Sequence, residues 1–316
     1  MRRDRAECAK GVSMARVSWA QELAWRAEAI AFDLFGALFR VLGPDAASAL
    51  GGALLRIFGP LTGTSRTAER NMRLAFPEMA ADERRRLLRA QWENVGRLFA
   101  EFPLTHRLTP ASGRVEVVGG EQLAAVARQG RAVVLVSGHF SNWEIMAAVI
   151  VHLGVDCQIT YRAANNPYID RRIIEARRRY GVKLLAPKGG DGSREILDAM
   201  KHGQSVAFLN DQKFNGGVAA PFFGRLVHSA PAPTRLALRF DTDMIPMSVE
   251  RTRGARFRVI VHPPLPIPRT GDKTADIHAG VAAVTAFMEA RVRARPHEWF
   301  WVHKRWPGEA YAELEG

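Results

Sequence analysis

The sequence from residue 132 to residue 144 reads AVVLVSGHFSNWE, and its pattern changes abruptly in the middle. The first five residues are apolar and mostly β-branched, which is typical of a buried strand in a sheet that is covered on both faces. Ser137 and Gly138 end that strand, and Ser141 or Asn142 can then cap a helix. His139 is therefore predicted at the carboxyl end of a strand, where α/β proteins commonly bind ligands.

Glu144 follows His139 by five positions. On a continuous helix of about 3.6 residues per turn the two would lie roughly 140° apart, so they meet only if His139 lies on the turn and Glu144 in the first helical turn. Glu144 would then fix the imidazole tautomer, and the other ring nitrogen would take a proton from a substrate hydroxyl. This spacing also occurs often by chance, so it needs support from the rest of the chain.

The chain after residue 110 alternates between predicted strands and predicted helices. Strands are expected at residues 115–118, 132–137, 157–161, 182–185, 205–210, 243–250 and 256–262. Helices are expected near residues 120–129, 142–153, 168–180, 192–202, 231–240 and 274–294. This alternation predicts an α/β fold with a mixed, mainly parallel sheet flanked by helices, whose last two strands form an antiparallel hairpin through Arg253-Gly254.

Several further motifs occur in a fixed order around these elements. They are Asn71–Pro77, Tyr161–Arg162 with Asn165–Pro167, Leu209–Lys213, Pro221–Gly224 and Trp299–Trp306. Together with the His-X4-Glu motif they resemble the late acyltransferases of lipid A biosynthesis, the lauroyl and myristoyl transferases of the His-X4-Asp/Glu acyltransferase superfamily. The resemblance runs from about residue 65 to residue 306, and it implies a fold like that of glycerol-3-phosphate acyltransferases.

The resemblance also implies a reaction. A fatty acyl chain would pass directly from an acyl carrier protein or coenzyme A thioester to a hydroxyl of a lipid A precursor, with His139 as the base and Glu144 as its partner. No other cofactor and no acyl-enzyme would be needed, and the protein would work at the cytoplasmic face of the inner membrane. A lysophospholipid, an ornithine-type lipid or another glycolipid is an alternative acceptor. A non-catalytic basic module on membrane or nucleic acid is a different alternative, against which the polar residues at strand ends argue, so no nucleic-acid partner is expected.

Other polar residues are candidates for substrate binding. Arg162 follows a strand, and its planar guanidinium suits a phosphate or a developing oxyanion, although an ion pair with Asp211 is an equal alternative. Asp211 ends another strand and would position Arg162 or the substrate. The remaining candidates, for which capping or solvated roles are the alternative, are Asn142, Asn165, Lys213 and Arg194. His297-Glu298 lacks the second histidine of a zinc motif, so no metal is predicted.

Composition limits the class of protein. A chain of 316 residues with 47% hydrophobic residues can bury a large core. Its net charge of +13 favours acidic partners such as membrane lipids, phosphorylated glycolipid or acyl carrier protein. The two cysteines, Cys8 and Cys157, give no disulfide framework, and Cys157 is expected in the core.

Residues 1–110 are predicted to form a helical, membrane-associated extension, and residues 111–316 the acyltransferase domain. Charged residues interrupt the apolar stretches, so neither a cleaved signal peptide nor a membrane-spanning helix is expected. An amphipathic helix in the membrane interface is predicted instead from Phe32, Leu34, Phe35, Leu38, Phe39 and Leu42, with packing on the protein's own core as the alternative. Two further segments have open roles. The arginines of residues 171–179 could attract an acidic partner or be solvated, and the aromatic residues at 222–223 and 299–306 could line an acyl groove, meet the bilayer or pack in the core.

Overall fold

A central sheet organises the part of the chain that the computed structural model describes, which is residues 18–182, 185–187 and 190–314. Seven strands lie in the order β1 (Val115–Val118), β9 (Arg256–Val261), β8 (Met244–Arg253), β2 (Val134–Ser137), β5 (Ser205–Leu209), β3 (Cys157–Tyr161) and β4 (Leu185–Pro187). Only the β8–β9 pair is antiparallel among these neighbours. The predicted mixed, mainly parallel sheet and its terminal hairpin are therefore confirmed.

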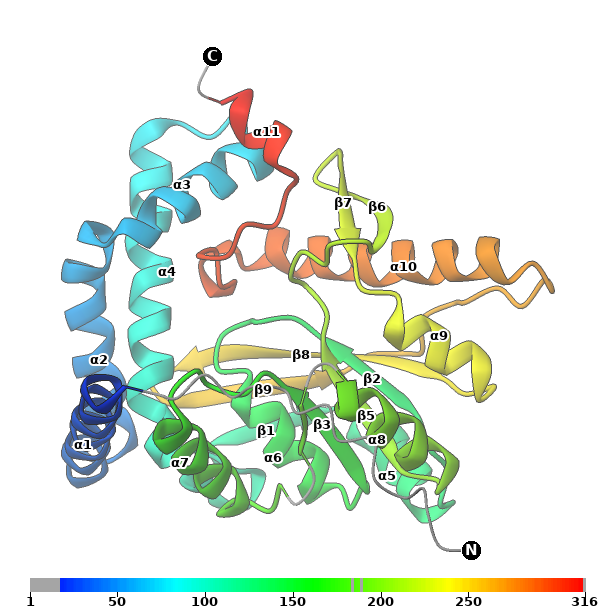
Figure 1. The fold of residues 1–316 in the computed structure, drawn as a ribbon, viewed down its shortest axis with the longest axis horizontal. Coiled ribbons are helices and arrows are strands. Elements are labelled where there is room, and N and C mark those ends of the chain that lie inside the picture. The colour runs from blue at the N-terminus through cyan, green and yellow to red at the C-terminus, as the bar shows by residue number, and fades with distance from the viewer. Residues whose placement is uncertain (1–17, 183–184, 188–189, 315–316) are drawn as a thin grey trace, which may run out of the picture.

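Helices cover both faces of this sheet, with α10 on one face and α6 on the other (Figure 1). They are α5 (Gly120–Arg128), α6 (Glu144–His152), α7 (Pro167–Arg178), α8 (Gly190–Lys201), α9 (Ala232–Arg239) and α10 (Lys273–Ala294), followed by the short α11 (Gly308–Ala312). Each of the six predicted helices is present within a few residues of its expected bounds. A two-stranded hairpin, β6 (Val218–Phe222) and β7 (Arg225–Ser229), was not expected, because Pro221 and Gly224 interrupt its apolar pattern.

The N-terminal region consists of α1 (Trp19–Leu42), α2 (Pro44–Phe58), α3 (Gly63–Ala75) and α4 (Ala81–Glu101). Helices α2 and α4 touch backbone to backbone, since a Cβ on Gly96 would lie 2.1 Å from the carbonyl oxygen of Gly51. Among the described residues, no helix is both long enough and apolar enough to cross a membrane. The division into an extension and a catalytic domain at residue 110 stays a prediction.

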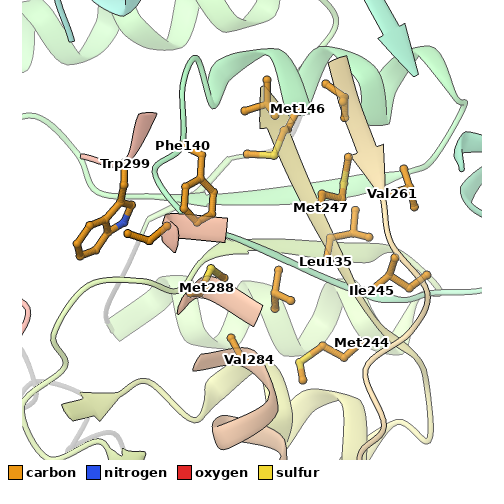
Figure 2. Packing of buried hydrophobic residues seen from close by; sticks show 14 of the residues in the cluster. Leu135, Phe140, Met146, Met244, Ile245, Met247, Val261, Val284, Met288 and Trp299 are labelled. Carbon is orange, nitrogen blue, oxygen red and sulfur yellow. The ribbon is translucent and has the colours of Figure 1, made fainter. Parts of the chain in front are cut away.

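The main core lies on both sides of β2 and β8, as Figure 2 shows. Leu135, Ile245 and Met247 come from the strands, and Met146 from α6 packs with them, while Met288 belongs to α10. All five side chains are at most 5% exposed. Apolar residues on both faces of the central strands explain why their sequences are continuous hydrophobic runs rather than alternating ones.

The aromatic segments also belong to this core. Phe222, Trp301 and Trp306 have no exposed surface, and Phe223 and Trp299 are buried too. Their rings pack edge to face with one another, Phe222 against Trp299 and Trp299 against Trp301. Of the three roles left open, core packing is the one that the structure supports for these five residues, while Phe300 is half-buried and lies near His139.

Candidate active site

The strand order determines which polar residues meet. Strand β2 lies between β8 and β5 and runs parallel to β5, so the carboxyl ends of β2 and β5 are adjacent. His139 follows β2 by two residues, and Asp211 follows β5 by two residues. The amide of Asn210 donates to the carbonyl of Ser137 at 2.8 Å, which holds the two strand ends in register. His139 and Asp211 are thereby brought face to face.

Asp211 holds His139 by two hydrogen bonds. Nδ1 of His139 lies 2.7 Å from Oδ1, and the backbone N–H of His139 donates to Oδ2 at 2.8 Å. Trp299 donates its indole N–H to the same Oδ2 at 2.8 Å. Because a carboxylate only accepts, the hydrogen on the imidazole is at Nδ1, which leaves Nε2 free to accept a proton. The geometry is that of a base with its orienting carboxylate.

Asp211 keeps its negative charge although its side chain is buried. Its residue is 3% exposed, and burial alone would raise the pKa of the carboxyl. The charge and hydrogen bonds of His139, with the Trp299 indole, outweigh burial and hold the pKa of Asp211 far below its usual value. Asp211 is consequently ionised at any pH at which the protein would be assayed.

Glu144 does not hold His139, which corrects the predicted pairing. It is the first residue of α6, and its carboxylate accepts two hydrogen bonds from Arg177, at 2.8 and 3.0 Å. The hydroxyl of Tyr180 donates a third at 2.7 Å. Burial would raise the pKa of Glu144, but the Arg177 charge and these hydrogen bonds lower it below its usual value. Glu144 misses His139 because of the orientation of its side chain. The first residues of α6 turn this side chain toward α7 rather than back over the turn that carries His139.

The turn between β2 and α6 is itself strained and tightly held. Ser141 has φ of 47°, a left-handed conformation that non-glycine residues rarely adopt. Asn142 is fully buried and donates to Glu101 of α4 at 2.9 Å, and Glu101 also pairs with Arg251 of β8. Asn142 therefore fastens the turn to the helical region, and its role in binding substrate stays a prediction.

Aromatic rings surround the imidazole of His139. Ring centroids lie 4.9 Å away for Trp143, 6.3 Å for Phe300 and 6.4 Å for His303. Burial lowers the pKa of His303, and the charges of His139 and Arg162 lower it further. The carboxamide of Gln212 reaches Nε2 of His139, with an N to N distance of 3.5 Å. Nε2 of the base thus lies beside the carboxamide of Gln212, and aromatic rings pack around the imidazole.

The other predicted substrate-binding residues lie on the surface. Arg162 is exposed just after β3, and Asp211 gives its oxygens to His139 and Trp299 instead of pairing with it. Asn165 and Lys213 are exposed in the loops that follow β3 and β5. Arg194 is exposed on α8. Arg162, Asn165 and Lys213 follow strands β3 and β5, and the substrate-binding roles of these three residues and of Arg194 stay predictions.

A cavity of about 780 Å³ lies on the other side of Trp143 and Glu144, between α1, α2, α4 and α7. Its wall is mainly apolar, with Phe32, Phe35, Phe39, Leu54, Leu55, Leu98, Phe99, Ile169 and Ile173. Trp143 both lines the cavity and touches the ring of His139. The cavity has a volume that is usual for a small-molecule site, and one tryptophan separates it from the candidate base.

Sequence reasoning missed four contributors to this region: Gln212, Trp299, Arg177 and Tyr180. Arg177 was placed among the arginines of a basic helix, where only an unpaired or partner-binding role was considered. A carboxylate predicted at the start of a buried helix could have indicated a cation opposite it, because buried charges are paired. Trp299 carried no such signal, since nothing in its neighbourhood of the sequence refers to Asp211. Cys157 lies on β3, where burial raises the pKa of its thiol, which suits an inert side chain.

Comparison with known proteins identifies the family of this chain. The model of the bacterial lipid A biosynthesis acyltransferases matches residues 24–307, which is most of the chain. The protein belongs to this family. A lipid A biosynthesis palmitoleoyltransferase from Escherichia coli (strain K12) is 25% identical over 260 residues, which cover 80% of this chain and 81% of the relative. The lipid A biosynthesis lauroyltransferase of the same organism is 26% identical over 254 residues, 76% of this chain and 78% of the relative.

A more distant relative acts on a different lipid. A phosphatidylinositol mannoside acyltransferase from Mycolicibacterium smegmatis is 22% identical over 196 residues, which cover 61% of this chain and 62% of the relative. The family and its relatives make the protein an acyltransferase with a lipid acceptor, as the resemblance of its motifs predicted.

Proposed function

We propose that this acyltransferase moves a fatty acyl chain from an acyl carrier protein thioester to a hydroxyl group of a lipid A precursor. His139 is the base in this proposal, and Asp211 is its orienting carboxylate. The observation that carries the assignment is the pair of hydrogen bonds by which Asp211 holds Nδ1 and the backbone N–H of His139, while among the described residues Nε2 meets only the long contact with the Gln212 amide. The two relatives from Escherichia coli, both acyltransferases of lipid A biosynthesis, support the acceptor.

The reaction follows from that geometry. Nε2 of His139 accepts the proton of the acceptor hydroxyl as its oxygen attacks the thioester carbonyl carbon, and Asp211 stabilises the imidazolium that forms. The tetrahedral intermediate then collapses, the carbon–sulfur bond breaks, and the imidazolium returns its proton to the thiolate. The products are an ester on the acceptor and the free thiol of the carrier. Because the acceptor oxygen attacks the thioester directly, no acyl-enzyme is required.

The cavity beside Trp143 supports a fatty chain as the transferred group. Its lining is apolar over most of its surface, and the excess of aromatic and aliphatic side chains suits a methylene chain. Charged residues at its edge, among them Arg40 and Arg172, would stay with the polar end of a lipid. The neighbouring Gly51 and Gly96 contribute backbone without side chains where α2 and α4 touch.

The outer face of α1 and α2 supports membrane association. Large apolar side chains are exposed along both helices, among them Leu34, Leu38, Val41, Ile57 and Phe58. Single exposed hydrophobic residues need no explanation, but a group on two adjoining helices favours contact with an apolar phase. With a net charge of +13, the protein would also be attracted to anionic lipids. Phe39 of the predicted amphipathic set is buried instead.

Reconstituted transfer tests the reaction. Purified protein would be incubated with labelled acyl carrier protein thioester and a lipid A precursor, with coenzyme A thioester and phosphatidylinositol mannoside as the alternative donor and acceptor. We expect transfer by the parent and none above background by His139→Ala. Transfer by His139→Ala at the parental rate would contradict the assignment of the base. A preference for the mannoside would keep the base and change the acceptor.

Sedimentation with vesicles tests the membrane face. Leu34→Glu and Ile57→Glu place a charge on side chains that are 66% and 64% exposed, so folding should be unaffected. Each should weaken binding to anionic vesicles by about ten- to a hundredfold, since a buried leucine or isoleucine contributes roughly 1.5–3 kcal/mol. Leu226→Glu, on a side chain of the β6–β7 hairpin that is 61% exposed, is the matched control. Equal loss in all three variants would argue against this face.

A further inference from the structure

The reaction that we propose needs a donor for the negative charge that develops on the thioester carbonyl oxygen. In many acyl-transfer enzymes backbone N–H groups provide it. Three amides of the turn that carries the base already have acceptors within the protein. His139 N donates to Asp211, Phe140 N to the carbonyl of Gly138, and Ser141 N to the carbonyl of Glu298 at 2.7 Å. The turn that carries His139 therefore does not offer these three amides to a substrate.

The side chain of Gln212 is placed to do this instead. Its carboxamide nitrogen lies 3.5 Å from Nε2 of His139, the atom that accepts the substrate proton. Since Nε2 carries no hydrogen in the tautomer set by Asp211, the amide donates and the imidazole accepts. At 3.5 Å this bond is weak, so an acceptor hydroxyl can displace the amide at low cost. The displaced N–H group would then be free to donate to a substrate atom next to the hydroxyl that His139 deprotonates.

The backbone that carries Gln212 is held from both sides. Asp211, the residue before it, is fixed by His139 and Trp299. The carbonyl of Gln212 itself accepts a hydrogen bond at 3.2 Å from Arg305, which is 2% exposed and also bonds the carbonyl of His228 and the hydroxyl of Ser229. A donor on a rigid backbone needs little reorganisation when charge develops, which is the condition for strong transition-state stabilisation.

We propose that Gln212 is a catalytic residue whose side-chain amide donates a hydrogen bond to the oxyanion of the tetrahedral intermediate. This inference rests on the proposed acyl transfer, and it adds the electrophilic half of the site to the base and carboxylate. In the resting protein the same amide caps the free nitrogen of His139. Substrate binding thus exchanges one hydrogen bond of Gln212 for another.

Two substitutions of Gln212 test the assignment by steady-state kinetics. Gln212→Met keeps the length of the side chain and removes the donor, and it should lower kcat by about 100- to 1000-fold, as the loss of one oxyanion donor does elsewhere. KM should stay nearly unchanged, because the bond forms only in the transition state. Gln212→Glu should lose at least as much, since it offers a negative charge to a negative oxygen. Gln122→Met, on the exposed surface of α5, is the matched control and should behave as the parent.

Different outcomes would count against the role of Gln212 and against the proposed acyl transfer itself. If the parent transfers acyl chains and Gln212→Met does so at the same kcat with an unchanged melting temperature, Gln212 is a bystander and the inference is wrong. If Arg162→Met shows the selective loss of kcat and Gln212→Met does not, the donor is Arg162 and the inference is overturned as well. If the parent itself transfers no chain to any acceptor, the proposed function fails first. A loss of kcat confined to the Gln212 variants supports the assignment.

Discussion

Asp211 and Glu144 are two buried carboxylates on either side of the same turn, and they differ in what they face. Asp211 is 3% exposed and has an imidazole as its partner, with a ring nitrogen open to the substrate. Glu144 is 7% exposed and is closed off by a guanidinium and a phenol. Both pKa values are lowered, so a perturbed carboxyl pKa does not distinguish the two roles. The partner of each carboxylate distinguishes the roles, because only an imidazole can carry a substrate proton near neutral pH.

The sharpest test of this difference is Asp211→Asn. The variant keeps the shape of the side chain but can no longer fix the productive tautomer or stabilise the imidazolium. We expect kcat to fall by about 10⁴-fold, the loss that the same change causes in a serine protease triad. Initial rates at saturating acceptor would measure it, with Asp198→Asn, an exposed aspartate paired with Lys201, as the control. A loss below tenfold would remove Asp211 from the dyad.

Glu144 should respond as a structural residue does. Arg177→Met leaves Glu144 buried without its cation, and it should lower the free energy of unfolding by about 3–5 kcal/mol. Glu144→Gln should destabilise by the same mechanism, and the double variant should recover part of the loss because no unpaired charge remains. Chemical denaturation would measure all three.

A kinetic result could reverse the roles that are assigned here to Asp211 and Glu144. If Glu144→Gln melted like the parent and yet lost kcat as severely as Asp211→Asn, Glu144 would act in the reaction and the two carboxylates would share the role. Arg225→Met, which removes an exposed ion pair with Glu313, is a control for the loss of an arginine and should cost less than about 1 kcal/mol.

The same comparison shows what the sequence could and could not reveal. Periodicity predicted the strands that end before His139 and before Asp211, and it placed both residues at the correct edge of the sheet. It did not reveal the strand order, which makes β5 the neighbour of β2. Without that order, the carboxylate nearest in sequence was taken as the partner of His139, although Asp211 lies 72 residues away along the chain. The Trp299 bond spans 88 residues, so it too depends on tertiary packing that no local pattern contains.

Removing one hydrogen bond from the Asp211 cluster gives a smaller effect. Trp299→Phe deletes the indole donor to Oδ2, which should cost about 1.5–3 kcal/mol, as hydrogen bonds to charged groups do. The lowered pKa of Asp211 adds stability that is complete above its ordinary value of 3.8 and is lost as the pH falls toward the native pKa. With one donor fewer that native pKa should rise, so acid unfolding of the variant should begin at a higher pH. Circular dichroism during acid titration would detect the shift, and an unchanged midpoint would contradict it.

Tyr180→Phe is the counterpart in the Glu144 cluster, and it should have the smallest effect. The phenol is buried and donates one hydrogen bond to Oε2, while Arg177 keeps both of its own. We expect a loss of about 1–3 kcal/mol in the free energy of unfolding and a kcat within a few-fold of the parent. Trp299→Phe and Tyr180→Phe remove one donor each from a buried carboxylate, so comparable destabilisation with a larger loss of kcat in Trp299→Phe would assign chemistry to Asp211 alone. A larger loss of kcat in Tyr180→Phe would instead connect Glu144 to the reaction, through the turn that it shares with His139.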